Sequence, residues 1–171
     1  MSDLDRTIFL LINDSAAPGL VDLLAKQASS LVVLLLVAHF LCGIVMRWHD
    51  VRTALQLGLF MAAGLTASYL VGWAMPVDRP FVQQLGHHLV LHAATPSFPS
   101  SHGLLIFTYS VVLTTAGKRR SGFFFFAGGL LVAWARIRAG VHFPFDMMGA
   151  LGLALMLGMV ASVTLRRFSV G

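Results

Sequence analysis

Four ionisable side chains within eleven residues are the strongest chemical signal in this sequence. The stretch 136–146 reads Arg-Ile-Arg-Ala-Gly-Val-His-Phe-Pro-Phe-Asp, in a chain where only 11% of residues are charged. His142 and Asp146 have the spacing of two side chains that share one face of a helix. An imidazole oriented by a carboxylate serves as a nucleophile or a base, and arginines suit phosphate oxygens. The stretch therefore predicts phosphoryl chemistry on a histidine.

Two further clusters of polar residues precede this stretch. The first is Asp78-Arg79-Pro80, and the second reads Ser-Phe-Pro-Ser-Ser-His-Gly over 97–103. A proline and serines ahead of an apolar run predict a helix start in the second cluster. The unpaired amides of a first helical turn, together with the helix dipole, form a site for an anion.

The composition predicts a membrane protein that must position these clusters. Hydrophobic residues make up 57% of the 171 residues, and the mean hydropathy is +0.82. Five apolar segments each approach the length of about 20 residues that crosses a bilayer: 28–46, 54–75, 100–117, 122–136 and 146–165. We expect an all-α, polytopic transmembrane bundle, with residues 1–171 forming one domain because every connection is too short to fold alone.

The first 27 residues are shorter and more amphipathic in pattern. We expect one or two interfacial helices within 1–27, from the segments 5–13 and 18–27. Asn13-Asp14-Ser15 followed by Pro18 resembles a helix start between them. A sixth span built from this region is the alternative. The acidic start of the chain does not fit a cleavable signal peptide.

Basic residues predict the orientation of the bundle. Five spans place seven of them on one side, which we expect to be the cytoplasm: Arg47, Arg52, Lys118, Arg119, Arg120, Arg166 and Arg167. The three polar clusters, all within 76–146, then gather at the opposite, periplasm-facing end. The net charge of +5 is explained by these connections and an anion site, so we expect no nucleic acid as partner.

The three clusters together resemble the type 2 phosphatidic acid phosphatase superfamily of membrane lipid phosphatases. Its signature is Lys-x6-Arg-Pro, then Pro-Ser-Gly-His, then Ser-Arg-x5-His-x3-Asp. Here Arg79-Pro80 matches the first motif, 99–102 matches the second with serine for glycine, and 135–146 matches the third with alanine for the leading serine. Gly72 stands where the signature has lysine. The run from Asp78 to Gly103 is most similar to the bacterial undecaprenyl-pyrophosphate phosphatases.

The resemblance implies a role for each matching residue. His142 attacks phosphorus and forms a phosphohistidine, Asp146 fixes the tautomer of His142, and His102 protonates the leaving oxygen and then activates water. The equatorial oxygens of the phosphate are held by a set of side chains and backbone amides: Arg79, Arg136, Ser100, and the amides around Ser101 and Gly103. No cofactor and no metal is implied, and the sequence has no acidic cluster that could bind magnesium.

The function implied is hydrolysis of undecaprenyl pyrophosphate at the periplasmic face of a bacterial inner membrane, with the bilayer and a lipid phosphate as partners. A phosphatidylglycerophosphate or phosphatidate phosphatase, or a lipid A phosphotransferase, is the alternative on the same site. A small permease subunit is the alternative outside enzymes, and it gives no reason for the three clusters.

Several residues keep two interpretations. Arg138 has a structural or a substrate-contacting role, and Asp78 pairs with Arg79 or with the site. His87, His88 and His92 resemble a metal cluster, but their spacing fits no strong ligand pattern, so we interpret them as a solvated loop. Phe123 to Phe126 form a lipid-facing or packing surface, or else line a groove for a polyprenyl tail.

Overall fold

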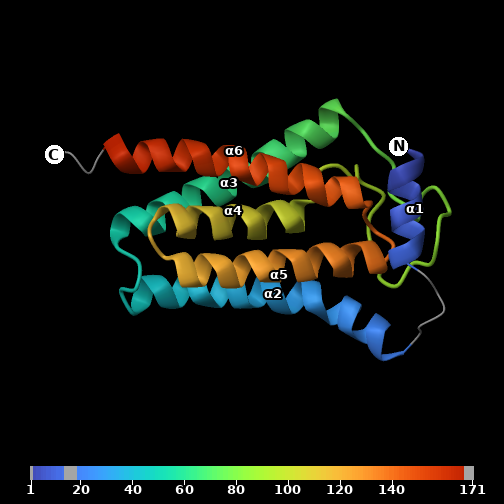
Figure 1. Cartoon of the computed structure of the whole chain (residues 1–171), viewed down its shortest axis with the longest axis horizontal. Coiled ribbons are helices and arrows are strands. Elements are labelled where there is room, and N and C mark those ends of the chain that lie inside the picture. The colour runs from blue at the N-terminus through green and yellow to red at the C-terminus, as the bar shows by residue number, and fades with distance from the viewer. Residues whose placement is uncertain (1, 14–18, 168–171) are drawn as a thin grey trace.

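The computed structural model describes residues 2–13 and 19–167 of the chain. These residues form α-helices and no strand, which confirms the predicted fold class. Figure 1 shows α2 to α6 running side by side along the long axis, with α1 across one end. The helices are α1 Asp3–Ile12, α2 Leu20–Val45, α3 Val51–Ala74, α4 Ser101–Thr115, α5 Arg119–Arg138 and α6 Pro144–Arg167.

The five predicted spans correspond in order to α2 through α6. By length and composition, α2, α3 and residues 144–164 of α6 can each cross a membrane. The apolar helix α4 has only 15 residues, and it lies against α3, α5 and α6. Most of its side chains are buried, so its neighbours rather than lipid surround it. The central helix α4 is therefore also the shortest of the helices α2 to α6.

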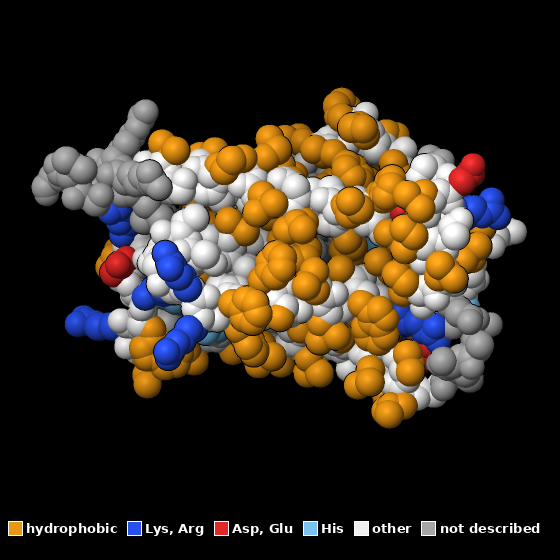
Figure 2. Space-filling view, in the orientation of Figure 1, with side chains coloured by type: hydrophobic (Ala, Val, Ile, Leu, Met, Phe, Trp, Pro, Cys, Tyr) orange, Lys and Arg blue, Asp and Glu red, His pale blue; other side chains and the backbone are white. Residues whose placement is uncertain are grey.

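The outer surface of the bundle is apolar. Figure 2 shows hydrophobic side chains over the whole middle of the molecule, while lysine and arginine gather towards the two ends. Exposed leucines recur along α2 and α3, among them Leu31, Leu34, Leu55 and Leu59. Such a surface is unfavourable in water and ordinary for a helix facing lipid tails. The structure thus has the surface of a multi-pass membrane protein.

Residues 20–27 differ from the prediction, because they are the first turns of α2 and not a separate interfacial segment. Ala25 and Ala28 pack with Ala135 of α5, so the helix continues past the predicted boundary. Asn13 caps the C-terminal end of α1, and residues 14–18 of the expected helix start lie outside the described residues. With ten residues, α1 is too short to be a sixth span.

The short helix α1 fastens the end of the bundle where the polar clusters lie. The carboxylate of Asp5 accepts a hydrogen bond from the N–H of Phe145 at 3.0 Å. Phe9 is fully buried, and its ring centroid lies 5.3 Å from that of Phe143. The Asn13 amide donates to the carbonyls of Arg138 at 2.7 Å and His87 at 3.0 Å. Residues of α1 therefore contact the loop between α5 and α6, which lies more than 120 residues further along the chain.

Glycine at position 140 is required by that loop. Its φ is +75°, and a Cβ there would lie 2.2 Å from the carbonyl oxygen of His87. Left-handed backbone alone costs a residue with a Cβ roughly 1–2 kcal/mol. We predict that Gly140→Ala lowers both the melting temperature in detergent and the catalytic activity. Gly152→Ala is the control, because a Cβ at Gly152 meets nothing within 4 Å. Equal melting temperatures for the two variants would contradict the prediction.

Candidate active site

The three polar clusters meet at the α1 end of the bundle. The N–H of Ser100 donates to the carbonyl of Asp146 at 3.2 Å, which ties the start of α4 to the start of α6. Gly103 permits this approach, since a Cβ there would lie 3.1 Å from Sδ of Met147. Arg79 reaches the same place from the connection between α3 and α4, where its Nη1 contacts His142. The convergence expected from the sequence is present.

The hydrogen bonds of His142 define its tautomer. Nδ1 lies 3.2 Å from Oδ2 of Asp146, and Nε2 lies 3.0 Å from Nη1 of Arg79. A carboxylate only accepts and a guanidinium only donates. The proton therefore sits on Nδ1, and the lone pair of Nε2 faces the arginine. This nitrogen is the one that can attack phosphorus.

Oδ2 of Asp146 accepts from three groups. Besides Nδ1 of His142, it accepts from the N–H of Phe143 at 2.8 Å and from the hydroxyl of Ser97. Ser97 Oγ also lies 3.4 Å from Nδ1 of His142. Ser97 is fully buried, and Asp146 is 2% exposed. Two of the donors thus belong to the loop directly before α6, and the third belongs to the 76–100 connection.

Burial sets the protonation state of His142. It lowers the pKa of the imidazole to about 4, against the opposing effect of Asp146 and with added effects of Arg79 and Arg136. A pKa below the ordinary value leaves the ring neutral at pH 7, with the Nε2 lone pair available. The pair His142–Asp146 is thus a neutral imidazole beside a carboxylate, as a nucleophile requires.

The two buried arginines differ in how their donors are used. Arg79 donates to the carbonyls of Thr95 at 2.9 Å, Pro96 at 3.1 Å and Val141 at 2.9 Å, so its guanidinium is fixed in place. Arg136 is 7% exposed, and its Nε and Nη2 have no hydrogen-bond partner among the described residues. Unpaired donors on a buried cation favour an anionic ligand.

The start of α4 holds the remaining predicted residues. Ser100 is the N-cap of α4, and its hydroxyl accepts from the N–H of Gly103 at 3.4 Å, a long bond. The Gly103 amide expected to bind phosphate is thus directed at this serine. The Ser101 hydroxyl lies 3.0 Å from that of Ser68 on α3. His102 is half-buried, and no hydrogen bond to it is found within 2–13 and 19–164.

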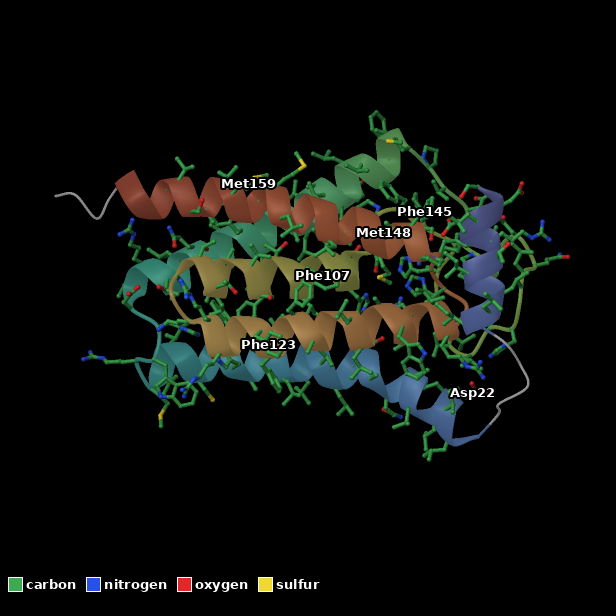
Figure 3. All side chains as sticks on the ribbon, viewed as in Figure 1. Asp22, Phe107, Phe123, Phe145, Met148 and Met159 are labelled. Carbon is green, nitrogen blue, oxygen red and sulfur yellow. The ribbon has the colours of Figure 1, made fainter. Side chains whose placement is uncertain are left out.

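Arg138 has a structural contact. Its Nε and Nη2 each lie 2.9 Å from Oδ1 of Asp22, and its Nη1 donates to the carbonyl of Ile12 at 3.2 Å. These bonds join the end of α5 to α1 and α2 (Asp22 is labelled in Figure 3). Asp78 is exposed, and within the described part of the chain it forms no ion pair with Arg79. The contacts of Arg138 therefore fit the structural interpretation, and Asp78 does not pair with Arg79.

The three histidines of the 76–100 connection have different contacts, although His88 and His92 both lie against Phe81. The N–H of His87 donates to Asn13, and the His88 ring stacks on Phe81 at a centroid distance of 4.4 Å. The His92 ring, in contrast, lies 6.5 Å from that of His142. No group of three or more metal-ligating side chains is found among the residues that the structure describes.

The structure also shows where Gly72 and the run from Phe123 to Phe126 lie. Gly72 borders a cavity of about 320 Å³ between α3 and the start of α4, which Arg79 and Ser101 also line. The position of the family lysine thus borders the cavity that Arg79 lines, and a Cβ there would contact the carbonyl oxygen of Phe98 and Cβ of Pro96 at 3.4 Å. Phe123 is exposed on α5, and Phe125 packs against Tyr109. The run is therefore both lipid-facing and core surface, towards the other end of α5 from His142 (Figure 3).

Ser97 is the functional residue that the sequence analysis did not assign. It stands within the second cluster, but its partner Asp146 is 49 residues away. We predict that Ser97→Ala lowers kcat by about 10- to 100-fold, since a hydrogen bond to a charged group is worth roughly 1.5–3 kcal/mol. Ser110→Ala, which loses a bond to the Gly122 carbonyl far from the site, should keep kcat within about threefold. Similar losses in both variants would indicate a general packing effect.

The protonation state of His142 can be measured directly. Nitrogen-15 NMR of histidine-labelled protein in detergent should show His142 neutral and protonated on Nδ1 between about pH 5 and 8, because its pKa is about 4. The His142→Ala variant assigns the signal. A titration midpoint above pH 6, or a proton on Nε2, would contradict the structure-based assignment.

Comparisons with known proteins identify the family of this chain. The sequence profile of the PAP2 superfamily matches residues 53–169. The chain is 34% identical over 167 residues to "Putative undecaprenyl-diphosphatase YbjG" of Escherichia coli (strain K12), covering 95% of this chain and 82% of that protein. It is 30% identical over 146 residues to "Undecaprenyl-diphosphatase BcrC" of Bacillus subtilis (strain 168), covering 85% and 74%.

Solved structures share the fold. The crystal structure of Aquifex aeolicus LpxE has a TM-score of 0.80 and 23% identity, and covers 94% of this chain and 95% of its own. A PAP2-type phosphatidylglycerolphosphate phosphatase from Bacillus subtilis has a TM-score of 0.76 and 20% identity, with 96% and 86% covered. Because the profile spans most of the chain and the two sequence relatives match along nearly all of it, the chain belongs to the PAP2 superfamily.

Proposed function

We propose that this protein is a lipid pyrophosphate phosphatase that hydrolyses undecaprenyl pyrophosphate to undecaprenyl phosphate and phosphate. One observation carries the proposal. Arg136 has two unpartnered guanidinium nitrogens in a buried site that also contains the neutral nucleophile His142 and the fixed cation Arg79. A tetrahedral anion such as phosphate supplies acceptors for the unpaired donors of Arg136 and negative charge to balance the two arginines. Phosphoryl transfer depends mainly on positioning and charge neutralisation, which this arrangement provides.

The first chemical step forms a bond to His142. Its Nε2 lone pair attacks the terminal phosphorus, the bond from phosphorus to the bridging oxygen breaks, and that oxygen takes a proton from His102. The Nη1 donor of Arg79 that now contacts Nε2 passes to an incoming phosphate oxygen, while its bonds to Thr95, Pro96 and Val141 keep the guanidinium in place. The unpaired donors of Arg136 bind further phosphate oxygens. Asp146 stabilises the positive charge that develops on the imidazole, through its bond to Nδ1. The products are undecaprenyl phosphate and a phosphohistidine.

The second step regenerates the enzyme. Water attacks the phosphohistidine phosphorus and gives its proton to His102, the phosphorus–nitrogen bond breaks, and inorganic phosphate leaves. The electron pair returns to Nε2, so the tautomer fixed by Asp146 and Ser97 is restored. His102 has a suitable place for both proton transfers, because it is half-buried at the start of α4 and the structure describes no hydrogen bond that occupies its ring.

The substrate follows from the sequence relatives. Both carry undecaprenyl-diphosphatase in their names, and they match this chain over 85–95% of its length. The solved structures of similar fold include a phosphatidylglycerolphosphate phosphatase, so other lipid phosphates belong in the test. A phosphohistidine also permits transfer to an acceptor other than water, which makes phosphate release and phosphate transfer two measurable outcomes.

The test is turnover by purified protein on undecaprenyl pyrophosphate, phosphatidate and phosphatidylglycerophosphate. We predict the highest kcat/KM for undecaprenyl pyrophosphate, and at least a 1,000-fold loss in His142→Ala, in keeping with loss of an essential nucleophile. His87→Ala is the matched control, because its ring lies outside the His142 site. A preference for phosphatidate would refute the substrate, and phosphate release within tenfold of wild type in His142→Ala would refute the nucleophile.

We further propose that the site faces the periplasm, across the inner membrane from the basic connections. Arg47, Arg52 and Lys118 lie at the end of the bundle opposite α1 (Figure 1), and basic connections favour the cytoplasm. A reporter fused after Gly171 should therefore read cytoplasmic, and one fused ahead of Ser2 should read periplasmic. A periplasmic signal from the C-terminal fusion would overturn both the orientation and the five-span topology.

A further inference from the structure

His92 lies against the site but has no part in the steps above. It belongs to the connection between α3 and α4, in which His88 stacks on Phe81 and His87 bonds to Asn13. The centroid of the His92 ring lies 6.5 Å from that of His142, with the rings at 76°. His92 is half-buried while His142 is 2% exposed, so His92 stands on the open side of the nucleophile.

The hydrogen bond of His92 leaves one ring nitrogen available. Nδ1 lies 2.9 Å from the carbonyl oxygen of Ala93, so Nδ1 carries the proton and donates it. No hydrogen bond to Nε2 is found among the described residues. Burial lowers the pKa of His92, the bond to Ala93 opposes this, and the charges of Arg79 and Arg136 lower it further. His92 therefore shares the electrostatic surroundings of the two site arginines.

The direction of attack decides which phosphate His92 can meet. In phosphoryl transfer the attacking and leaving atoms lie roughly in line on opposite sides of phosphorus. With Nε2 of the buried His142 as the attacking atom, the leaving group is directed to the open side of the site. In a pyrophosphate that leaving group is itself a charged phosphate, and in a monoester it is the oxygen of a lipid alcohol, which has no phosphate group to bind.

We propose that His92 forms a second phosphate subsite, which binds the lipid-linked phosphate of a pyrophosphate and so separates pyrophosphates from monoesters. The subsite rests on the proposed function for its substrate, but its ligand chemistry is testable without turnover. When a phosphate dianion approaches, the neutral ring gains a proton on Nε2 and donates a charge-assisted hydrogen bond. Glycine at position 72, where the family signature has lysine, leaves the site with one cation fewer, so a proton gained by His92 neutralises a larger share of the substrate's charge.

The binding arm uses methylenebisphosphonate, a pyrophosphate analogue that is not hydrolysed, and inorganic phosphate as the single-phosphate probe. In His92→Phe the ring and its packing on His142 and Phe81 are retained, while both nitrogens are lost. We expect about 10- to 100-fold weaker binding of the bisphosphonate, as for loss of a charged hydrogen bond, and phosphate affinity within about twofold. His88→Phe is the matched control in the same loop and should change neither affinity. Equal losses for both probes, or no loss, would overturn the subsite.

The turnover arm compares farnesyl pyrophosphate with farnesyl phosphate, which differ only by the second phosphate. His92→Phe should lower kcat/KM for the pyrophosphate by about 10- to 100-fold and leave the monoester within about threefold. His102→Ala should shift the ratio the other way, because an alkoxide needs the proton of a general acid more than a phosphate does. Shifts of the same sign in both variants would overturn the division of roles.

The two arms separate failure of the subsite from failure of the proposed function. If the wild-type protein prefers the bisphosphonate through His92 but hydrolyses neither the farnesyl compounds nor undecaprenyl pyrophosphate, the subsite stands and the phosphatase proposal falls. If it hydrolyses the pyrophosphate but its preference for the bisphosphonate survives in His92→Phe, the phosphatase stands and the subsite falls.

Discussion

The carboxylate of Asp146 is the group on which this end of the molecule depends. It is 2% exposed, and one of its oxygens accepts from Nδ1 of His142, the N–H of Phe143 and the hydroxyl of Ser97. A buried carboxylate is costly unless such donors surround it. Two donors come from the loop before α6 and the third from the segment before α4, so satisfying one charge ties both segments to the first turn of α6, which carries Asp146.

More than one cation surrounds this single carboxylate, so the site has a net positive charge. Arg138 is balanced by Asp22, whereas Arg79 and Arg136 share the neighbourhood of Asp146 without another acidic partner in the described part of the chain. Arg79 is satisfied by backbone carbonyls of the 95–96 segment, but Arg136 retains unpaired donors. The fold therefore holds positive charge at the edge of an apolar bundle, where an anionic headgroup supplies the missing partner.

Residue types and spacing were sufficient to predict the bundle and the central groups of the site. The apolar segments matched the helices because length and hydropathy decide which segments cross a bilayer. His142 and Asp146 do meet, because they are close in sequence, but His142 lies in the loop before α6 and not on one helix with Asp146, as the spacing had indicated. Long-range partners could not be predicted. Asp22 is 116 residues from Arg138, and nothing in either neighbourhood marks the pair. For the same reason the continuity of α2 through residues 20–27, which depends on contacts with α5, was missed.

The contacts between α1 and the loop before α6 affect how the site is assembled during synthesis. Asp5 and its partner Phe145 are 140 residues apart, and Phe9 packs on Phe143. α1 leaves the ribosome before these partners do, and it can contact Phe145 only after 140 further residues have been made. Until then the apolar face that carries Phe9 would be exposed to water, and an amphipathic helix can bury such a face in the surface of the bilayer. The loop that carries His142 is thus held by a helix that was made long before it.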